Sequence, residues 1–254
     1  MDNLKRKIKR ISKEKQLENM IKSFKDLKWY EIIMIIIMTV IAGMSVYSAI
    51  VHPETSNNPL WLTIINFISA ICGIMCIFFC AKANISNFIF AVINTFVYAI
   101  FLFYHKIYGT FALEVFFYMP INFISWYIWT QHRDDKEIEK TKSKKLTLFQ
   151  NILTAILVIG GGLIYHIVLV KLGGNVAWLD AFTLSIGIVA VLLEMFRFKE
   201  QYFWWIITDI IAVAMYIIYF DPVYLTKKAI YLIMAVIGYI NWHKLNKERN
   251  KTNE

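Results

Sequence analysis

The sequence lacks the motifs that mark most enzymes. It contains no glycine-rich phosphate loop, no His-Glu-x-x-His pair and no serine, histidine and aspartate in an order that would make a hydrolase. Cysteine is also scarce: Cys72, Cys76 and Cys80 fall at i, i+4 and i+8 of one predicted helix, with no histidine or carboxylate beside them. We interpret the three as a stripe of small apolar side chains, not as a metal site. The sequence therefore predicts no catalysis, no metal and no cofactor.

Charged residues are absent over long stretches. Apolar residues make up 58% of the 254 residues, against about 45–50% in a soluble domain. They gather in blocks of about 17–24 residues, long enough to cross a roughly 30 Å hydrocarbon core as helices, whereas barrel strands are shorter and alternate. The predicted fold class is an all-α integral membrane protein. Its eight expected spans are Tyr30–Ile50, Leu60–Ala81, Phe88–Tyr104, Thr110–Thr130, Leu148–Val170, Trp178–Phe196, Tyr202–Phe220 and Ala229–Leu245.

The net charge of +9 is unevenly distributed. Ten of the 27 lysines and arginines lie in residues 1–28, with no signal-peptide-like segment before Trp29. With the N-terminus inside, the predicted spans put 23 basic residues on the cytoplasmic side and four outside, as the positive-inside rule requires. We expect both termini in the cytoplasm, a cell-membrane location, and a basic arm that lies on anionic lipid and does not bind nucleic acid.

The second half of the chain resembles the first. The segment Asn87–Asn94 aligns with Tyr202–Asp209, which pairs Asn94 with Asp209. Further on, the pattern Tyr-x6-Ser-x3-Trp from Tyr118 matches Tyr-x6-Gly-x3-Trp from Tyr231. Three helices repeated with one helix between them give parallel halves, so a solute path can run between two bundles.

This repeat predicts two parallel three-helix bundles joined by a linker helix, a 3+1+3 design, with one extra N-terminal transmembrane helix. The expected segments are a basic cytoplasmic arm (1–28), the extra helix and an outer loop (29–59), the first repeat (60–130), a cytoplasmic loop and the linker helix (131–177), the second repeat (178–242) and a cytoplasmic tail (243–254).

Polar residues inside the spans are the candidates for function. A charged group deep in a membrane helix costs on the order of 2.5–3.5 kcal/mol and usually lines a cavity or finds a partner. Glu114, Tyr118 and Asn122 share one helix face, and Trp205 and Asp209 share another. Aromatic faces and carboxylates suit a flat, hydroxylated cation. The last two predicted spans offer Asp209 no intramembrane lysine or arginine, since Lys227 and Lys228 fall at the outer end, so we expect the substrate to be the counter-ion of Asp209. The predicted substrate-binding residues are Asn87, Asn94, Tyr98, Glu114, Tyr118, Asn122, Trp126, Tyr202, Trp205, Asp209 and Tyr231.

Other residues have structural interpretations. Glu194 closes the sixth span, where we expect it at interface depth, and Gly160–Gly162 allow close helix approach. The tryptophans near span ends are interpreted as interface anchors, and they are Trp29, Trp61, Trp178 and Trp242.

From Leu60 to Trp242 the segments NISNFIFAVIN, IYGTFALEVFFYMPINFISWYIW, WLDAFTLSIGIVAVLL and QYFWWIITD resemble the PnuC family of vitamin transporters. The resemblance implies facilitated diffusion of nicotinamide riboside through a fold like that of the SWEET sugar transporters. It also implies a cytoplasmic kinase that traps the vitamin by phosphorylation. The family's tryptophan-x-x-tryptophan-x-x-x-asparagine pattern appears here as Tyr202, Trp205 and Asp209.

Other functions stay open. Relatives in the family carry thiamine or deoxynucleosides, and the departure at Asp209 falls on an expected substrate contact. A non-transporting membrane scaffold or sensor, whose polar groups only join helices, is the alternative from another class. The expected partners are a small cationic vitamin or nucleoside, the lipid bilayer and the kinase; the oligomeric state is open and includes a homo-oligomer.

Overall fold

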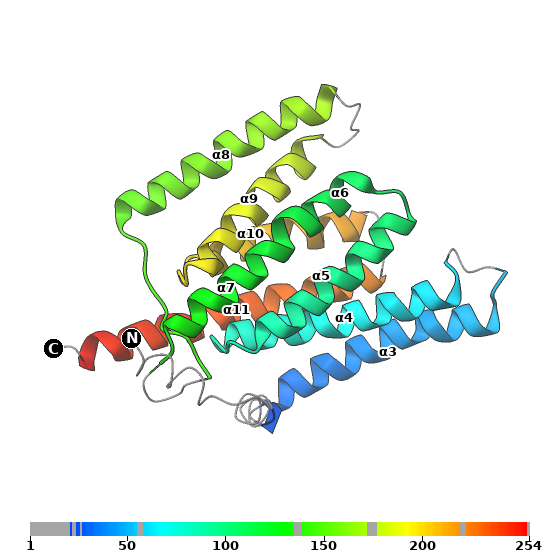
Figure 1. The fold of residues 1–254 in the computed structure, drawn as a ribbon, viewed down its shortest axis with the longest axis horizontal. Coiled ribbons are helices and arrows are strands. Elements are labelled where there is room, and N and C mark those ends of the chain that lie inside the picture. The colour runs from blue at the N-terminus through cyan, green and yellow to red at the C-terminus, as the bar shows by residue number, and fades with distance from the viewer. Residues whose placement is uncertain are drawn as a thin grey trace, which may run out of the picture.

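The computed structural model describes residues 21, 24–25, 27–54, 58–134, 139–171, 177–218 and 222–252, and these form an all-helical protein, as predicted (Figure 1). Most of the predicted basic arm, 1–28, lies outside the described residues. The elements are α3 (Trp29–Val51), α4 (Leu60–Ala81), α5 (Asn87–Tyr104), α6 (Tyr108–Leu113), the π-helical turn η1 (Glu114–Tyr118), α7 (Met119–Gln131), α8 (Leu148–Lys171), α9 (Ala177–Met195), α10 (Gln201–Ile218) and α11 (Pro222–Thr252).

Five helical segments are long and apolar enough to cross a membrane: α3, α4, α5, the run from Thr110 to Gln131, and α8. The helices α9 and α10 have shorter apolar parts, Ala181–Met195 and Gln201–Ala214. Helices therefore occupy all eight predicted spans, while their parallel 3+1+3 orientation stays a prediction.

The last helix begins earlier than predicted. We expected it to start at Ala229, after an outer loop that contained Lys227 and Lys228, but α11 starts at Pro222. Proline suits a first helical position because it has no N–H to leave unpaired there and its φ is already helical. Both lysines consequently lie inside the helix.

The fourth predicted span is interrupted by a π-helical turn. The N–H of Met119 donates to the carbonyl of Glu114, five residues back, and Pro120 follows at the start of α7. A proline removes one helical hydrogen bond and crowds the preceding turn, and the wider turn relieves this crowding. Such turns are often found at functional sites.

The two halves contact each other twice. The first helix of one half packs on the last helix of the other, which gives the pairs α4 with α11 and α7 with α9. The extra helix α3 covers the first of these seams, where Met38 packs with Phe78 of α4 and Met234 of α11. An ion pair of 2.6 Å between buried Glu31 and Lys82 fixes the start of α3 beside the α4–α5 turn.

The turns that follow α4 and α9 have the same hydrogen bonds. Ala83 N–H donates to the carbonyl of Cys80, and Arg197 N–H donates to that of Glu194. Ala83 and Arg197 both have positive φ, 56° and 67°. These pairs match residues 114 positions apart, so the alignment at 115 predicted from sequence is wrong by one residue for α5 and α10. Asp209 corresponds to Thr95, and not to Asn94.

Two buried tryptophans join the halves reciprocally. The indole N–H of Trp129 donates to the carbonyl of Glu194 at 2.9 Å, and that of Trp242 donates to the carbonyl of Cys80, also at 2.9 Å. The two rings lie 5.4 Å apart. The interpretation of Trp242 as an interface anchor is therefore wrong, because its side chain is fully buried. Trp29, Trp61 and Trp178 are exposed on the protein surface, as an anchor must be.

The glycines of α8 allow the predicted close approach. A Cβ on Gly161 would lie 2.6 Å from the hydroxyl of Ser185, and one on Gly162 would lie 2.8 Å from the ring of Phe182, both on α9. Gly160 has open space around it.

Candidate substrate cavity between the two halves

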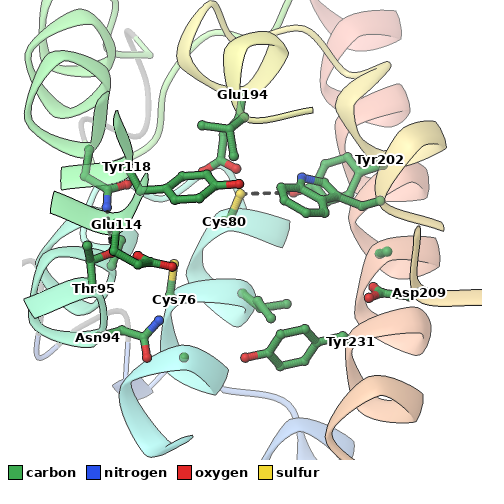
Figure 2. A pocket seen from close by; sticks show the side chains of 17 residues that line it. Cys76, Cys80, Asn94, Thr95, Glu114, Tyr118, Glu194, Tyr202, Asp209 and Tyr231 are labelled. Carbon is green, nitrogen blue, oxygen red and sulfur yellow. Dashed lines mark hydrogen bonds between the residues drawn. The ribbon is translucent and has the colours of Figure 1, made fainter. Parts of the chain in front are cut away.

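A cavity of about 320 Å³ lies where the two halves meet. Its volume falls at the lower end of the 300–1,000 Å³ typical of small-molecule sites. Figure 2 shows its walls, with Glu194, Tyr118 and Cys80 toward one end and Asn94 and Tyr231 toward the other. The lining residues are Gly73, Cys76, Ile77, Cys80, Ala91, Asn94, Thr95, Glu114, Tyr118, Asn122, Val191, Glu194, Tyr202, Trp205, Asp209, Tyr231 and Ala235.

Eight of the eleven residues predicted from sequence line this cavity: Asn94, Glu114, Tyr118, Asn122, Tyr202, Trp205, Asp209 and Tyr231. Three do not. Asn87 is fully buried and its amide donates to the Glu194 carboxylate at 3.4 Å, so it contacts a lining residue from behind. Tyr98 stacks on Phe101, and Trp126 packs against the core around Trp129. The contact of any of these residues with substrate stays a prediction.

The cavity is built from matching positions of the two halves. In the first half Tyr118 points its hydroxyl toward Gly187 of α9, 3.6 Å from where a Cβ would be. In the second half Tyr231 points its hydroxyl toward Gly73 of α4, only 2.7 Å from that place. Glycine is needed at Gly73 because the phenol occupies the space of a side chain. Each tyrosine thus fills a gap left by the opposite half.

The chemistry at matching positions differs. Cys80 corresponds to Glu194, Ala91 to Trp205, and Thr95 to Asp209, and all six line the cavity. In the first half, the Asn122 amide donates to the Thr95 hydroxyl at 3.2 Å and the Ser69 hydroxyl donates to Asn94 at 2.7 Å. At these three pairs of positions, the second half carries a tryptophan ring and two carboxylates that the first half lacks.

Asp209 has a counter-charge within the protein. The ammonium of Lys228 lies 3.0 Å from the Asp209 carboxylate, and the Asp209 side chain is almost fully buried. The ammonium groups of Lys227 and Lys228 also lie 5.6 and 5.5 Å from the centre of the Tyr231 ring. The expectation that α10 and α11 offer Asp209 no cation, which made the substrate its counter-ion, is wrong. It followed from the misplaced start of α11.

Sequence reasoning missed several lining residues. Glu194 was expected at interface depth, but it lines the cavity. Cys76 and Cys80 were interpreted as an apolar stripe, yet they face the cavity, and the Cys80 sulfur lies 3.4 Å from the Tyr202 hydroxyl. The signal that could have found Glu194 is its position as a carboxylate at the end of an apolar helix, four residues beyond Ala190 on a buried face.

The arrangement of a polar, aromatic cavity between two matched helical halves defines a class of membrane protein that passes a small solute between its bundles. Residues 63–244 match the family model described as nicotinamide mononucleotide transporter, and the chain belongs to that family.

Named relatives agree. The chain is 31% identical over 192 residues to the nicotinamide riboside transporter PnuC of Neisseria mucosa, covering 72% of this chain and 73% of that one. It is 29% identical over 191 residues to the PnuC of Haemophilus influenzae, covering 75% and 82%. A solved structure described as the vitamin B3 transporter PnuC matches with a TM-score of 0.67 at 28% identity, over 87% of this chain and 94% of that one. The resemblance to the PnuC family is confirmed, and the chain is a multi-pass membrane transporter, not an enzyme.

Proposed function

We propose that this protein carries nicotinamide riboside into the cytoplasm by facilitated diffusion. The observation that supports this most directly is the cavity, which combines three tyrosines, a tryptophan and three carboxylates in a space sized for one vitamin. Nicotinamide riboside offers matching groups: a flat cationic ring for the aromatic faces and hydroxyls for the amides of Asn94 and Asn122. Relatives named as nicotinamide riboside transporters give the same substrate.

The direction of uptake is then set by a cytoplasmic kinase and not by an ion gradient. We propose that the protein lies in the cell membrane with both termini in the cytoplasm, because that orientation puts 23 basic residues inside and four outside, and two of those four, Lys227 and Lys228, lie within α11. A cytoplasmic kinase that phosphorylates the vitamin would keep it inside, because the three carboxylates that line the cavity would repel the added phosphate. Uptake should be indifferent to proton and sodium gradients.

The test is counterflow in proteoliposomes that contain the purified chain and no kinase. Liposomes preloaded with unlabelled nicotinamide riboside should take up labelled vitamin, and an uncoupler or sodium removal should leave the rate unchanged. Thiamine and thymidine, tested as competitors, identify the alternative substrates. If none of the three ligands exchanges while the protein remains folded, the proposed substrate and its transport by facilitated diffusion are wrong.

A further inference from the structure

Three carboxylates line the cavity, and two of them have a cation close by on α11. Lys228 pairs with Asp209 at 3.0 Å. The preceding residue, Lys227, has its ammonium 5.6 Å from the centre of the Tyr231 ring, and Tyr231 lines the same cavity as Glu114. A cationic substrate would have to compete with a tethered ammonium group at either of these sites, which makes both poor places to recognise its charge.

Glu194 is different. Its side chain accepts a hydrogen bond from the neutral Asn87 amide at 3.4 Å, and the neutral thiol of Cys80 lines the same end of the cavity (Figure 2). Among the residues that the structure describes, no ion pair joins Glu194 to a lysine or an arginine. Its place is fixed, because the indole of Trp129 holds the backbone carbonyl of Glu194 at 2.9 Å.

The surroundings of Glu194 suit a flat cation. The aromatic residues Tyr118 and Tyr202 line the same end of the cavity (Figure 2). A carboxylate in a low-dielectric site is costly unless a positive charge compensates it. We propose that Glu194 is the residue that recognises the positive charge of the substrate. This inference rests on the proposed function and names the group that selects a cation over a neutral molecule.

The inference also sets the orientation of the bound molecule. The matching position in the first half is Cys80, which carries no charge. The cationic ring therefore lies toward Glu194, and the hydroxylated sugar lies toward Asn94 at the other end.

The experiment compares two ligands that differ in charge and have nearly the same shape. Nicotinamide riboside is a cation, and its reduced dihydronicotinamide form is neutral. Isothermal titration of the full chain in detergent should show that the wild type binds the cation at least about ten-fold more tightly, the range of a charge-assisted hydrogen bond. In Glu194→Gln the affinity for the cation should fall about ten-fold or more, while that for the neutral form changes less than about three-fold. The exposed Glu54→Gln is the matched control for a lost negative charge and should keep the preference.

The outcomes separate this inference from the proposed function. If the wild type binds neither ligand, the proposed function fails. If it binds nicotinamide riboside but prefers it no more than the neutral form, or if Glu194→Gln keeps the preference, the function stands and the role of Glu194 is overturned. Should Glu194→Gln fail to fold, Glu194→Asp is measured instead: it withdraws the carboxylate by one methylene and should reduce the preference for the cation, and an unchanged preference there overturns the inference.

Discussion

The two halves of the cavity agree in their scaffold and differ in their chemistry. Both use the same turn after the first helix, a buried tryptophan bonded to the opposite half, and a tyrosine that fills a glycine gap across the interface. The groups facing the cavity are unlike: Cys80 against Glu194, Ala91 against Trp205, Thr95 against Asp209. The scaffold is the same in both halves, because the same helix contacts hold each of them together. A substrate with one charged end and one hydroxylated end requires the lining to be asymmetric.

The comparison predicts that Trp129 and Trp242 contribute equally to the free energy of unfolding. Trp129→Ala and Trp242→Ala should each lower the free energy of unfolding by about 3–5 kcal/mol, because each removes a fully buried ring together with its hydrogen bond to the opposite half. Thermal unfolding in detergent measures the loss. The exposed Trp29→Ala is the control and should change little. If one of the buried tryptophans is tolerated, the scaffold is not shared as the structure indicates.

The second prediction concerns the ion pair that the first half lacks. Asp209→Asn or Lys228→Met alone should destabilise the protein by about 1–3 kcal/mol, because each leaves a charge without its partner. The double variant should recover most of that loss. The double-mutant cycle in detergent gives the coupling. Single effects that simply add would show that the pair contributes nothing to the fold.

The sequence predicts the helical scaffold better than it predicts the residues that line the cavity. The helices follow from their apolar blocks, and eight of eleven candidates reach the cavity because polar groups in lipid must face inward. The register of α5 against α10 was wrong because Asn94 resembles Asp209 more than Thr95 does, although Thr95 holds the matching place. Similar chemistry is a poor guide where the two halves have diverged.

The role of Lys228 could not be predicted for a different reason. Two adjacent lysines normally end a membrane span, so they were assigned to a loop. The helix instead starts at Pro222, which brings Lys228 to Asp209. The π-helical turn at Glu114–Tyr118 likewise depends on tertiary packing around Pro120, which helix periodicity does not encode.

The third prediction uses the aromatic difference. Trp205 occupies the place that Ala91 holds in the first half, so Trp205→Ala makes the two walls alike. We expect a loss of about 0.5–2 kcal/mol of affinity for a cationic vitamin, because a ring face over the cation is removed. The variant should stay folded, since the ring is only partly buried. Counterflow and titration measure the effect, and unchanged uptake would remove Trp205 from the site.

The smallest effect is expected at the two matched glycines. A methyl group at Gly73 would lie 2.7 Å from the Tyr231 hydroxyl, so Gly73→Ala must push that phenol into the cavity. The far end of a side chain can move, and we expect about 1 kcal/mol or less of lost stability together with weaker substrate binding. Gly187→Ala is the control from the other half: its methyl group would lie 3.6 Å from the Tyr118 hydroxyl, an ordinary contact, and should leave binding unchanged. Unfolding temperature and titration with nicotinamide riboside are measured on both. If both alanine variants weaken binding equally, the two gaps are equivalent and the cavity is more symmetric than the structure shows. If only Gly73→Ala weakens binding, the tighter contact is the one between Tyr231 and α4.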